Sequence, residues 1–278
     1  MSGPVLVGVD GSVTSVAAVE TAARLADRLG VGIRLTQACE WPAAHVPPGA
    51  PPWNAGGSGT HGLVKGALTE AERLARCTAP WLRVTHQVLV GDPVTVLESE
   101  SRGASLTVVG SRPTSRSGGE RRGSVAVRLA ARGRCSVLVV RGGPDRTGPV
   151  VLTGEHGHAG REAAEFAFAE ASARGTDLVV LDGLGMHDRR RRNTFDDRLS
   201  VLREKYPDVD VRRPRVPGRT RRAVIEASTH AQLVVVGTPG RRGAAASLPT
   251  RVGRTALRHA DCSVAVIRAE EENRRRDR

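Results

Sequence analysis

The sequence predicts an α/β protein made of two similar domains, each built from strands that alternate with helices. Three observations support this. Short β-branched runs such as Leu106–Val109 alternate with longer amphipathic segments along the chain, which is typical of parallel sheets with crossover helices. The same order of segments recurs in the second half of the chain. The length of 278 residues also fits two domains of ordinary size.

The first half of the chain contains five predicted strands with four helices between them. Pro4–Val9 is an apolar run that Asp10-Gly11-Ser12 closes, so a buried strand ends there in a turn. Apolar residues then keep helical spacing from Val16 to Ala26, before a stop at Gly30. The next predicted elements are a strand at 33–38, an irregular connection at 40–60, a helix at 63–79, a strand at 82–90 and a helix at 94–101.

The stretch from Ala104 to Arg141 predicts a binding function. A β-branched run ends at Gly110, and a loop rich in glycine, serine and arginine follows; Gly123 then leads into an amphipathic helix and a last strand, Val137–Val140. A right-handed parallel crossover places this loop at the carboxyl end of the strand, where open α/β sheets bind ligands. Glycines let the backbone approach an anion, and the first helix amides attract it. We therefore expect a phosphate site.

The second half of the chain repeats this plan. Val150–Gly154 followed by Glu155 corresponds to the first strand followed by Asp10. Arg189–Arg192 is expected to lie in a loop, and Val209–Val216 to form the third strand. From Gly110 and Gly237 to Cys135 and Cys262, the two halves match without a gap at a constant offset of 127 residues. We predict a duplication, with domains at 1–143 and 148–270 and a charged tail at 271–278.

Five segments resemble the universal stress protein family: VGVDGS at 7–12, VGDP at 90–93, VVGSR at 108–112, GSV at 123–125 and CSVLVV at 135–140. With both halves included, nearly the whole chain resembles a tandem universal stress protein of the kind frequent in actinobacteria. The resemblance implies doubly wound, Rossmann-like domains, each with a five-stranded parallel sheet of order 3-2-1-4-5 and helices on both faces. It also implies pairing through the last strands, Val137–Val140 against Val264–Ile267, which a tandem chain can make within itself.

The ATP-binding members of this family carry glycine, two residues, glycine, nine residues, then Gly-Ser or Gly-Thr. In the first half this register falls on Gly110, Pro113, Gly123 and Ser124, so three of four positions match. Pro113 departs from the pattern because proline has no amide hydrogen. Arginines of the same loop, Arg112 among them, can offset this loss by charge-assisted contacts with a phosphate.

The resemblance therefore implies an adenine nucleotide, ATP or AMP, with or without Mg²⁺. It places Asp10, Ala38 and Val109 around the adenosine, and Gly110, Gly123, Ser124 and Val125 at the ribose and phosphates. On the local pattern alone, Asp10 is better interpreted as a turn or helix-cap aspartate. In the second half the register gives Gly237, Gly240, Thr250 and Arg251. A side chain stands where backbone should approach phosphate, so we expect that half to be degenerate and one nucleotide to bind per chain.

Other functions find less support in the sequence. The net charge of +13 is almost all arginine, and aromatic residues are too few for stacking on single strands, so nucleic-acid binding is the least favoured alternative. No apolar run approaches the roughly 18 residues of a membrane helix. The four cysteines and the histidines have no metal-ligand spacing, and the cysteines are expected to pack as small apolar residues. Neither a Walker sequence nor a nucleophile with its base is recognisable.

The predicted protein is thus a cytoplasmic universal stress response protein, a nucleotide-binding regulatory module with at most slow ATP hydrolysis. A stress-related interaction protein whose loop has lost its nucleotide is the alternative, which Pro113 allows. The protein partner and further pairing of chains into a homodimer stay open.

Overall fold

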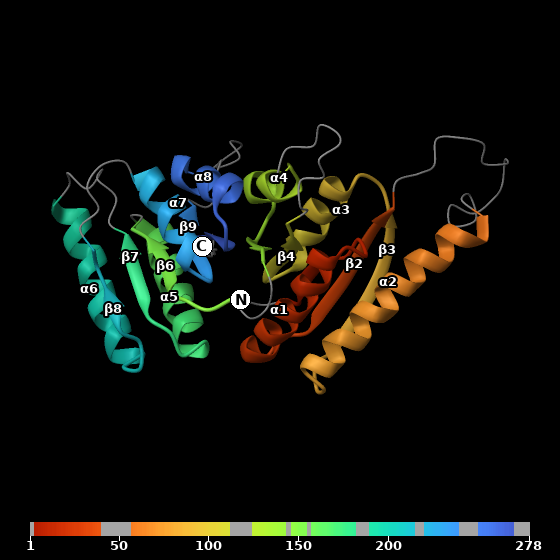
Figure 1. Ribbon diagram of the computed structural model, residues 1–278, viewed down its shortest axis with the longest axis horizontal. Helices are drawn as coiled ribbons and strands as arrows, with labels where there is room; N and C mark the ends of the chain where they lie inside the picture. The colour runs from red at the N-terminus through yellow and green to blue at the C-terminus, as the bar shows by residue number, and fades with distance from the viewer. Residues whose placement is uncertain are drawn as a thin grey trace, which may run out of the picture. The chain divides into compact units, whose positions relative to one another are not determined.

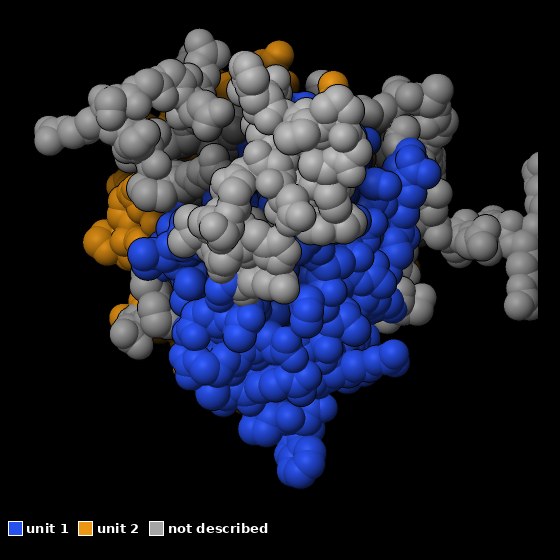
Figure 2. Space-filling view, turned by 90° about the vertical axis from the view of Figure 1, so that its right-hand side faces the viewer, with its two compact units in different colours: residues 1–129, 133–144 blue, residues 130–132, 145–278 orange. Residues whose placement is uncertain are grey.

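The computed structural model describes residues 3–39, 57–111, 124–142, 146–154, 157–181, 189–214, 220–238 and 250–269. The chain forms two compact units, which Figure 2 colours blue and orange. Unit 1 comprises residues 1–129 and 133–144, and unit 2 comprises residues 130–132 and 145–278. None of the helices in the described parts of the chain is long and apolar enough to cross a membrane.

Unit 1 alternates strands and helices as predicted (Figure 1). Its elements are β1 (Val5–Gly8), α1 (Val13–Leu29), β2 (Ile33–Cys39), α2 (Gly57–Thr78), β3 (Val84–Val90), α3 (Pro93–Glu100), β4 (Leu106–Gly110), α4 (Ser124–Arg132) and β5 (Ser136–Val140). A 3-10 turn, Ser101–Gly103, follows α3. All strand pairs are parallel, and the strand order is β3-β2-β1-β4-β5. This confirms the predicted order 3-2-1-4-5.

Unit 2 has the same plan, with order β8-β7-β6-β9-β10 and parallel pairing. Its elements are β6 (Val150–Thr153), α5 (Gly157–Ala173), β7 (Leu178–Leu181), α6 (Arg189–Lys205), β8 (Val211–Arg212), α7 (Thr220–His230), β9 (Leu233–Thr238), α8 (Arg251–His259) and β10 (Ser263–Arg268). The pairing of the two units through their last strands, the domain limits and the homodimer stay predictions. The tail at 271–278 lies outside the described residues.

Two sequence expectations for unit 2 are wrong. Arg189–Arg192 begin helix α6 and do not lie in a loop. The helix continues because Phe195, Leu199 and Leu202 follow at helical spacing and are all buried. The strand expected over 209–216 is reduced to Val211–Arg212, where Pro214 has no amide hydrogen to extend the ladder.

Local chemistry sets the ends of helix α1. Ser12 caps its N-terminus by accepting a hydrogen bond from the Ser15 amide, and Gly30 ends it with a left-handed φ of 64°. The buried face of α1 consists mostly of alanine, with Val19 and Leu25 among the larger residues. It packs against α2, β1 and β4. Small side chains on this face let the helix lie close to the sheet.

A serine makes the same joint in both units, which sequence comparison did not single out. The Ser101 hydroxyl donates to the Glu98 carbonyl (2.6 Å) and accepts from the Arg134 amide (2.9 Å). The Ser228 hydroxyl donates to the Ile225 carbonyl (2.6 Å) and accepts from the Asp261 amide (3.1 Å). Each bond therefore ties the end of α3 or α7 to the turn before the last strand. The matching atoms support the duplication.

The cysteines only partly fit the prediction. Cys135 and Cys262 are buried, as expected for small apolar residues. Cys39 at the end of β2 is half-buried, and burial raises the pKa of its thiol. For Cys77 the prediction is wrong, because its side chain lies on the exposed side of α2. None of the four forms a disulfide.

Candidate functional site

The predicted site lies where the strand order of unit 1 reverses. From β1 the chain proceeds through β2 and β3 on one side of the sheet, and through β4 and β5 on the other. Gly8 of β1 pairs in register with Val109 of β4, so Asp10 and Gly110 leave the sheet at the same carboxyl edge. Open α/β sheets bind ligands at such a reversal.

Asp10 forms a hydrogen-bonded turn at this edge. Its Oδ1 accepts from the Ser12 amide (3.0 Å) and from the Ser12 hydroxyl (2.6 Å). Gly11 between them has a φ of 76°, which favours glycine. Ser12 also contacts Thr14, with 3.1 Å between their hydroxyl oxygens. The interpretation of Asp10 as a turn aspartate is confirmed, whereas a role in holding adenosine stays a prediction.

Gly110 is packed against the beginning of α1. A Cβ atom added there would lie 2.5 Å from the Thr14 carbonyl carbon and oxygen, and 2.8 Å from the Ser15 nitrogen. A real Cβ does not tolerate such distances to backbone. Glycine is therefore required at the end of β4 by packing alone. Sequence reasoning had explained it only by the approach of an anion. A glycine at the same position in both halves was the available signal.

The other predicted residues of unit 1 are only partly described. Val109 is buried on β4 and Ala38 is half-buried near the end of β2, so the structure brings both to the edge that holds Asp10. Val125 is half-buried in the first turn of α4. Ser124 begins that helix. Arg112, Pro113 and Gly123 lie outside the described residues.

The corresponding helix of unit 2 starts with its own cap. The Thr250 Oγ1 accepts from the Gly253 amide at 3.1 Å, while the side chain of Arg251 is exposed. At the constant offset, Thr250 corresponds to Gly123 and Gly253 to Ala126. An amide that could face a phosphate is thus occupied by a side chain in unit 2, whereas in unit 1 the capping position carries no side chain. Glu155 and Gly240 lie outside the described residues.

Asp92 is a further polar residue at the carboxyl edge of unit 1. It caps α3: its Oδ2 accepts from the Thr95 amide (3.0 Å) and the Thr95 hydroxyl (2.9 Å). These bonds, the amide first, lower the pKa of Asp92. Arg128 of α4 lies 3.9 Å from the same oxygen. Asp92 is thus a capping carboxylate that links α3 to α4. In the described parts of the chain, no group of three His, Cys, Asp or Glu residues could hold a metal ion.

Comparison with known proteins gives a consistent result. The model of the universal stress protein family matches residues 1–141 and 183–268. Universal stress protein Rv2623 of Mycobacterium tuberculosis is 31% identical over 287 residues, covering 95% of this chain and 96% of that protein. Universal stress protein Rv1996 of the same organism is 32% identical over 303 residues, covering 95% and 94%. A crystal structure of a universal stress protein from Archaeoglobus fulgidus has a TM-score of 0.72 at 16% identity, covering 97% and 99% of the two chains.

Proposed function

The chain belongs to the universal stress protein family, and from this premise we propose that it is a stress-response regulatory module that binds one adenine nucleotide, ATP or AMP, in unit 1. The adenosine would lie between the ends of β1, β2 and β4, beside Asp10, Ala38 and Val109. Gly110, Arg112, Gly123, Ser124 and Val125 would face the ribose and phosphates. Unit 2 would hold no nucleotide.

The observation that carries this proposal is the difference between the two equivalent helix starts. The Gly253 amide donates its hydrogen to the Thr250 side chain within unit 2, so this amide is not available to a phosphate. In unit 1 the equivalent amide belongs to Ala126, and Gly123 at the capping position has no side chain to bond it. The helix N-terminus of unit 1 is therefore the better anion acceptor.

We propose binding without efficient catalysis. Asp92, a carboxylate at this edge, is engaged in capping α3, and Asp10 is hydrogen-bonded to Ser12. Neither is a free general base. Nucleotide occupancy would instead change a surface at this edge that a partner protein reads. The alternative, an interaction module that has lost its nucleotide, is favoured by one feature, Pro113, which removes a phosphate donor from the loop.

Calorimetric titration of the purified chain with ATP and AMP tests the proposal. We expect one saturable site per chain, and we expect Gly123→Val to weaken it by about tenfold or more, because a branched side chain blocks the approach of phosphate. Thr250→Val is the matched control, since it places the same residue at the equivalent position of unit 2 and should leave affinity unchanged.

Three results would reject the nucleotide site as placed. Absence of saturable binding, together with native mass spectra free of adenine nucleotide, would favour the interaction module. Equal binding by the Gly123→Val variant would remove the phosphate site from α4. Loss of binding in the Thr250→Val variant alone would move the site to unit 2.

A further inference from the structure

Unit 1 contains a groove at the amino-terminal edge of its sheet, opposite the edge discussed above. The groove has a volume of about 370 Å³, within the usual range of ligand pockets, roughly 300–1,000 Å³. It is lined by residues at the beginnings of β1, β2 and β3: Gly3, Pro4, Val31, Gly32, Ile33, Arg34, Arg83 and Thr85. None of the eight lining residues is acidic.

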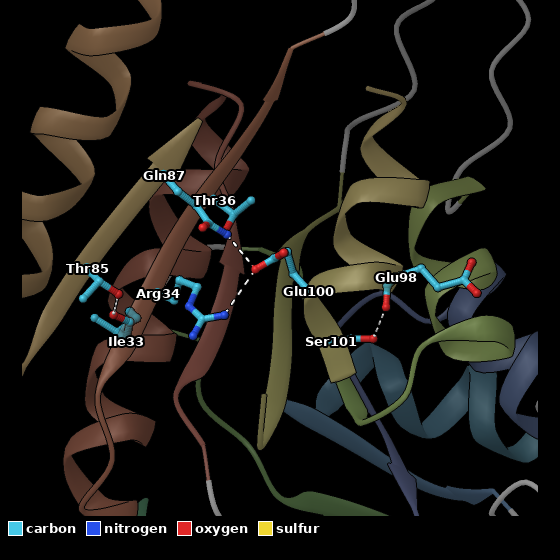
Figure 3. Close-up of polar contacts among 8 residues, drawn as sticks. All are labelled: Ile33, Arg34, Thr36, Thr85, Gln87, Glu98, Glu100 and Ser101. Carbon is cyan, nitrogen blue, oxygen red and sulfur yellow. Dashed lines mark hydrogen bonds and ion pairs between the residues drawn. The ribbon is translucent and has the colours of Figure 1, made fainter. Parts of the chain in front are cut away.

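The groove carries one net positive charge. Arg34 and Thr85 pair in register, so both side chains are on the same face of the sheet. The Arg34 Nη1 lies 3.2 Å from Glu100 Oε2, which also accepts from the Gln87 amide at 2.7 Å. Figure 3 shows Arg34 and Gln87 converging on Glu100. Glu100 thus neutralises Arg34, and Arg83, the second arginine of the lining, supplies the excess charge.

Arg83 is available to a ligand. Its side chain is exposed, and its backbone carbonyl is already used by the Ile33 amide (2.8 Å). Within the described ranges, no carboxylate forms an ion pair with it. The neighbouring position, Gly32, has no side chain, and a Cβ atom there would lie 2.9 Å from the Arg83 carbonyl oxygen. At Gly32, beside Arg83, the groove is therefore lined by backbone atoms only.

The same corner of unit 2 carries two carboxylates in place of Gly32 and Arg83. Its backbone bonds are equivalent: Val150 donates to Asp177 and Leu178 donates to Asp210, as Val5 donates to Gly32 and Ile33 to Arg83. Gly32 thus corresponds to Asp177, and Arg83 to Asp210. Both of these carboxylates pair with Arg212, at 2.7 Å and 3.3 Å. Two carboxylates with one guanidinium leave this corner of unit 2 with no charge to attract an anion.

We propose that the groove of unit 1 is a second binding site, for a small organic monocarboxylate with an apolar body. Guanidinium groups bind carboxylates in a bidentate geometry, and within the described ranges no carboxylate of the chain pairs with Arg83. A singly charged ligand matches the single excess charge. Pro4 and Val31, both half-buried, offer apolar surface for the remainder of the ligand. This site is separate from the proposed nucleotide site and does not depend on it.

Phenylacetate is a suitable probe, and calorimetry or ligand-observed NMR is the measurement. We expect saturable binding of one phenylacetate per chain, weakened about tenfold or more in Arg83→Asp, which gives unit 1 the carboxylate that unit 2 has at this position. Arg102→Asp is the matched control, because it makes the same charge change at an exposed arginine outside the lining. It should leave phenylacetate affinity within about twofold. Circular dichroism checks that both variants fold.

Each remaining outcome overturns part of the proposal. No saturable binding of phenylacetate to the wild-type chain overturns the site. Undiminished binding by Arg83→Asp removes it from the groove. Equal binding of the neutral amide, phenylacetamide, shows that charge is not recognised. Tighter binding of inorganic phosphate at the same residues overturns the carboxylate class. ATP titrated in parallel reports on the carboxyl edge, so failure here is distinguishable from failure of the proposed function.

Discussion

Units 1 and 2 pack the last turn of their first helix with different chemistry. In unit 1 two positions of this turn are leucines, of which Leu25 is buried and Leu29 is exposed. In unit 2 the same positions hold Glu170 and Arg174, because Val31 donates to Ala26 as Thr176 donates to Ala171. Arg174 bonds the buried Glu170 (2.7 Å) and Gln232 (2.9 Å), and Gln232 in turn donates to the Gly148 carbonyl (2.6 Å).

The difference shows that one backbone plan tolerates both solutions. The hydrogen bonds of the Ser101 and Ser228 joints match in the two units, as do the backbone bonds that end the first helix, while the side chains around them diverge. Equivalent positions that differ therefore report on packing or on ligands, and not on the fold itself. This is why the groove beside Arg83, and the glycine at 123 where unit 2 has Thr250, are informative.

Arg174→Leu should break the polar solution of unit 2 and have the largest effect. It leaves the Glu170 carboxylate, only 2% exposed, without its guanidinium, and loss of one partner of a buried pair costs about 3 kcal/mol or more. The double variant Glu170→Leu/Arg174→Leu copies unit 1 and should recover most of that stability. Urea unfolding measures both. A double variant as unstable as the single one would show that the two units are not interchangeable at this turn.

Gly110→Ala should lower the free energy of unfolding by about 2 kcal/mol. The added Cβ meets the backbone of Thr14, which cannot move aside as a flexible side chain could. Gly66→Ala in α2 is the control: nothing lies within 4 Å of its added Cβ, and it should stabilise by roughly 0.5–1 kcal/mol. Gly237→Ala in unit 2 should cost about as much as Gly110→Ala. Unfolding is measured without nucleotide. No loss for Gly110→Ala would leave ligand binding as the reason for that glycine.

Much of the fold was predictable from the sequence because it depends on local patterns. Apolar strands, the helix stop at Gly30 and the offset of 127 residues predicted the ten strands seen in the described residues and their duplication. The start of α6 was missed because a run of arginines resembles a loop until Phe195 and Leu199 are known to be buried.

The site was less predictable, since it depends on residues far apart in the chain. Arg34 and Glu100 are separated by 66 residues, and no local pattern indicates that they meet. The cap made by Thr250 and the packing of Gly110 on α1 were likewise beyond sequence reasoning. Asp10 was the exception, because the Asp-Gly-Ser turn carries its own local signature.

Ser101→Ala and Ser228→Ala test a feature that the two units share. Each removes the acceptor of a backbone amide, from Arg134 in unit 1 and from Asp261 in unit 2. Both serines are buried, so each change should cost about 1 kcal/mol. Because the joint is the same in both units, the two losses measured by urea unfolding should agree within about 0.5 kcal/mol. A marked inequality would show that the joints differ in strength despite their matching atoms.

The smallest effect concerns a carboxylate that bridges two helices of unit 2. Glu165 of α5 accepts from Lys205 (2.6 Å) and from Arg198 of α6, and the Lys205 bond is the main cause that lowers the pKa of Glu165. Within the described residues, its counterpart Glu20 bonds Arg24 of the same helix, α1. A carboxylate whose pKa is lower in the folded than in the unfolded chain stabilises the fold at pH values above its unfolded pKa, near 4.3. This stabilisation is lost as the pH falls through the pKa of the folded state. Glu165→Gln should therefore cost about 0.5 kcal/mol of stability at pH 7 and less near pH 3. Urea titrations at both pH values measure this, with Glu20→Gln as the control; a cost that is undiminished at the lower pH would mean that the carboxylate acts through packing and not through its charge.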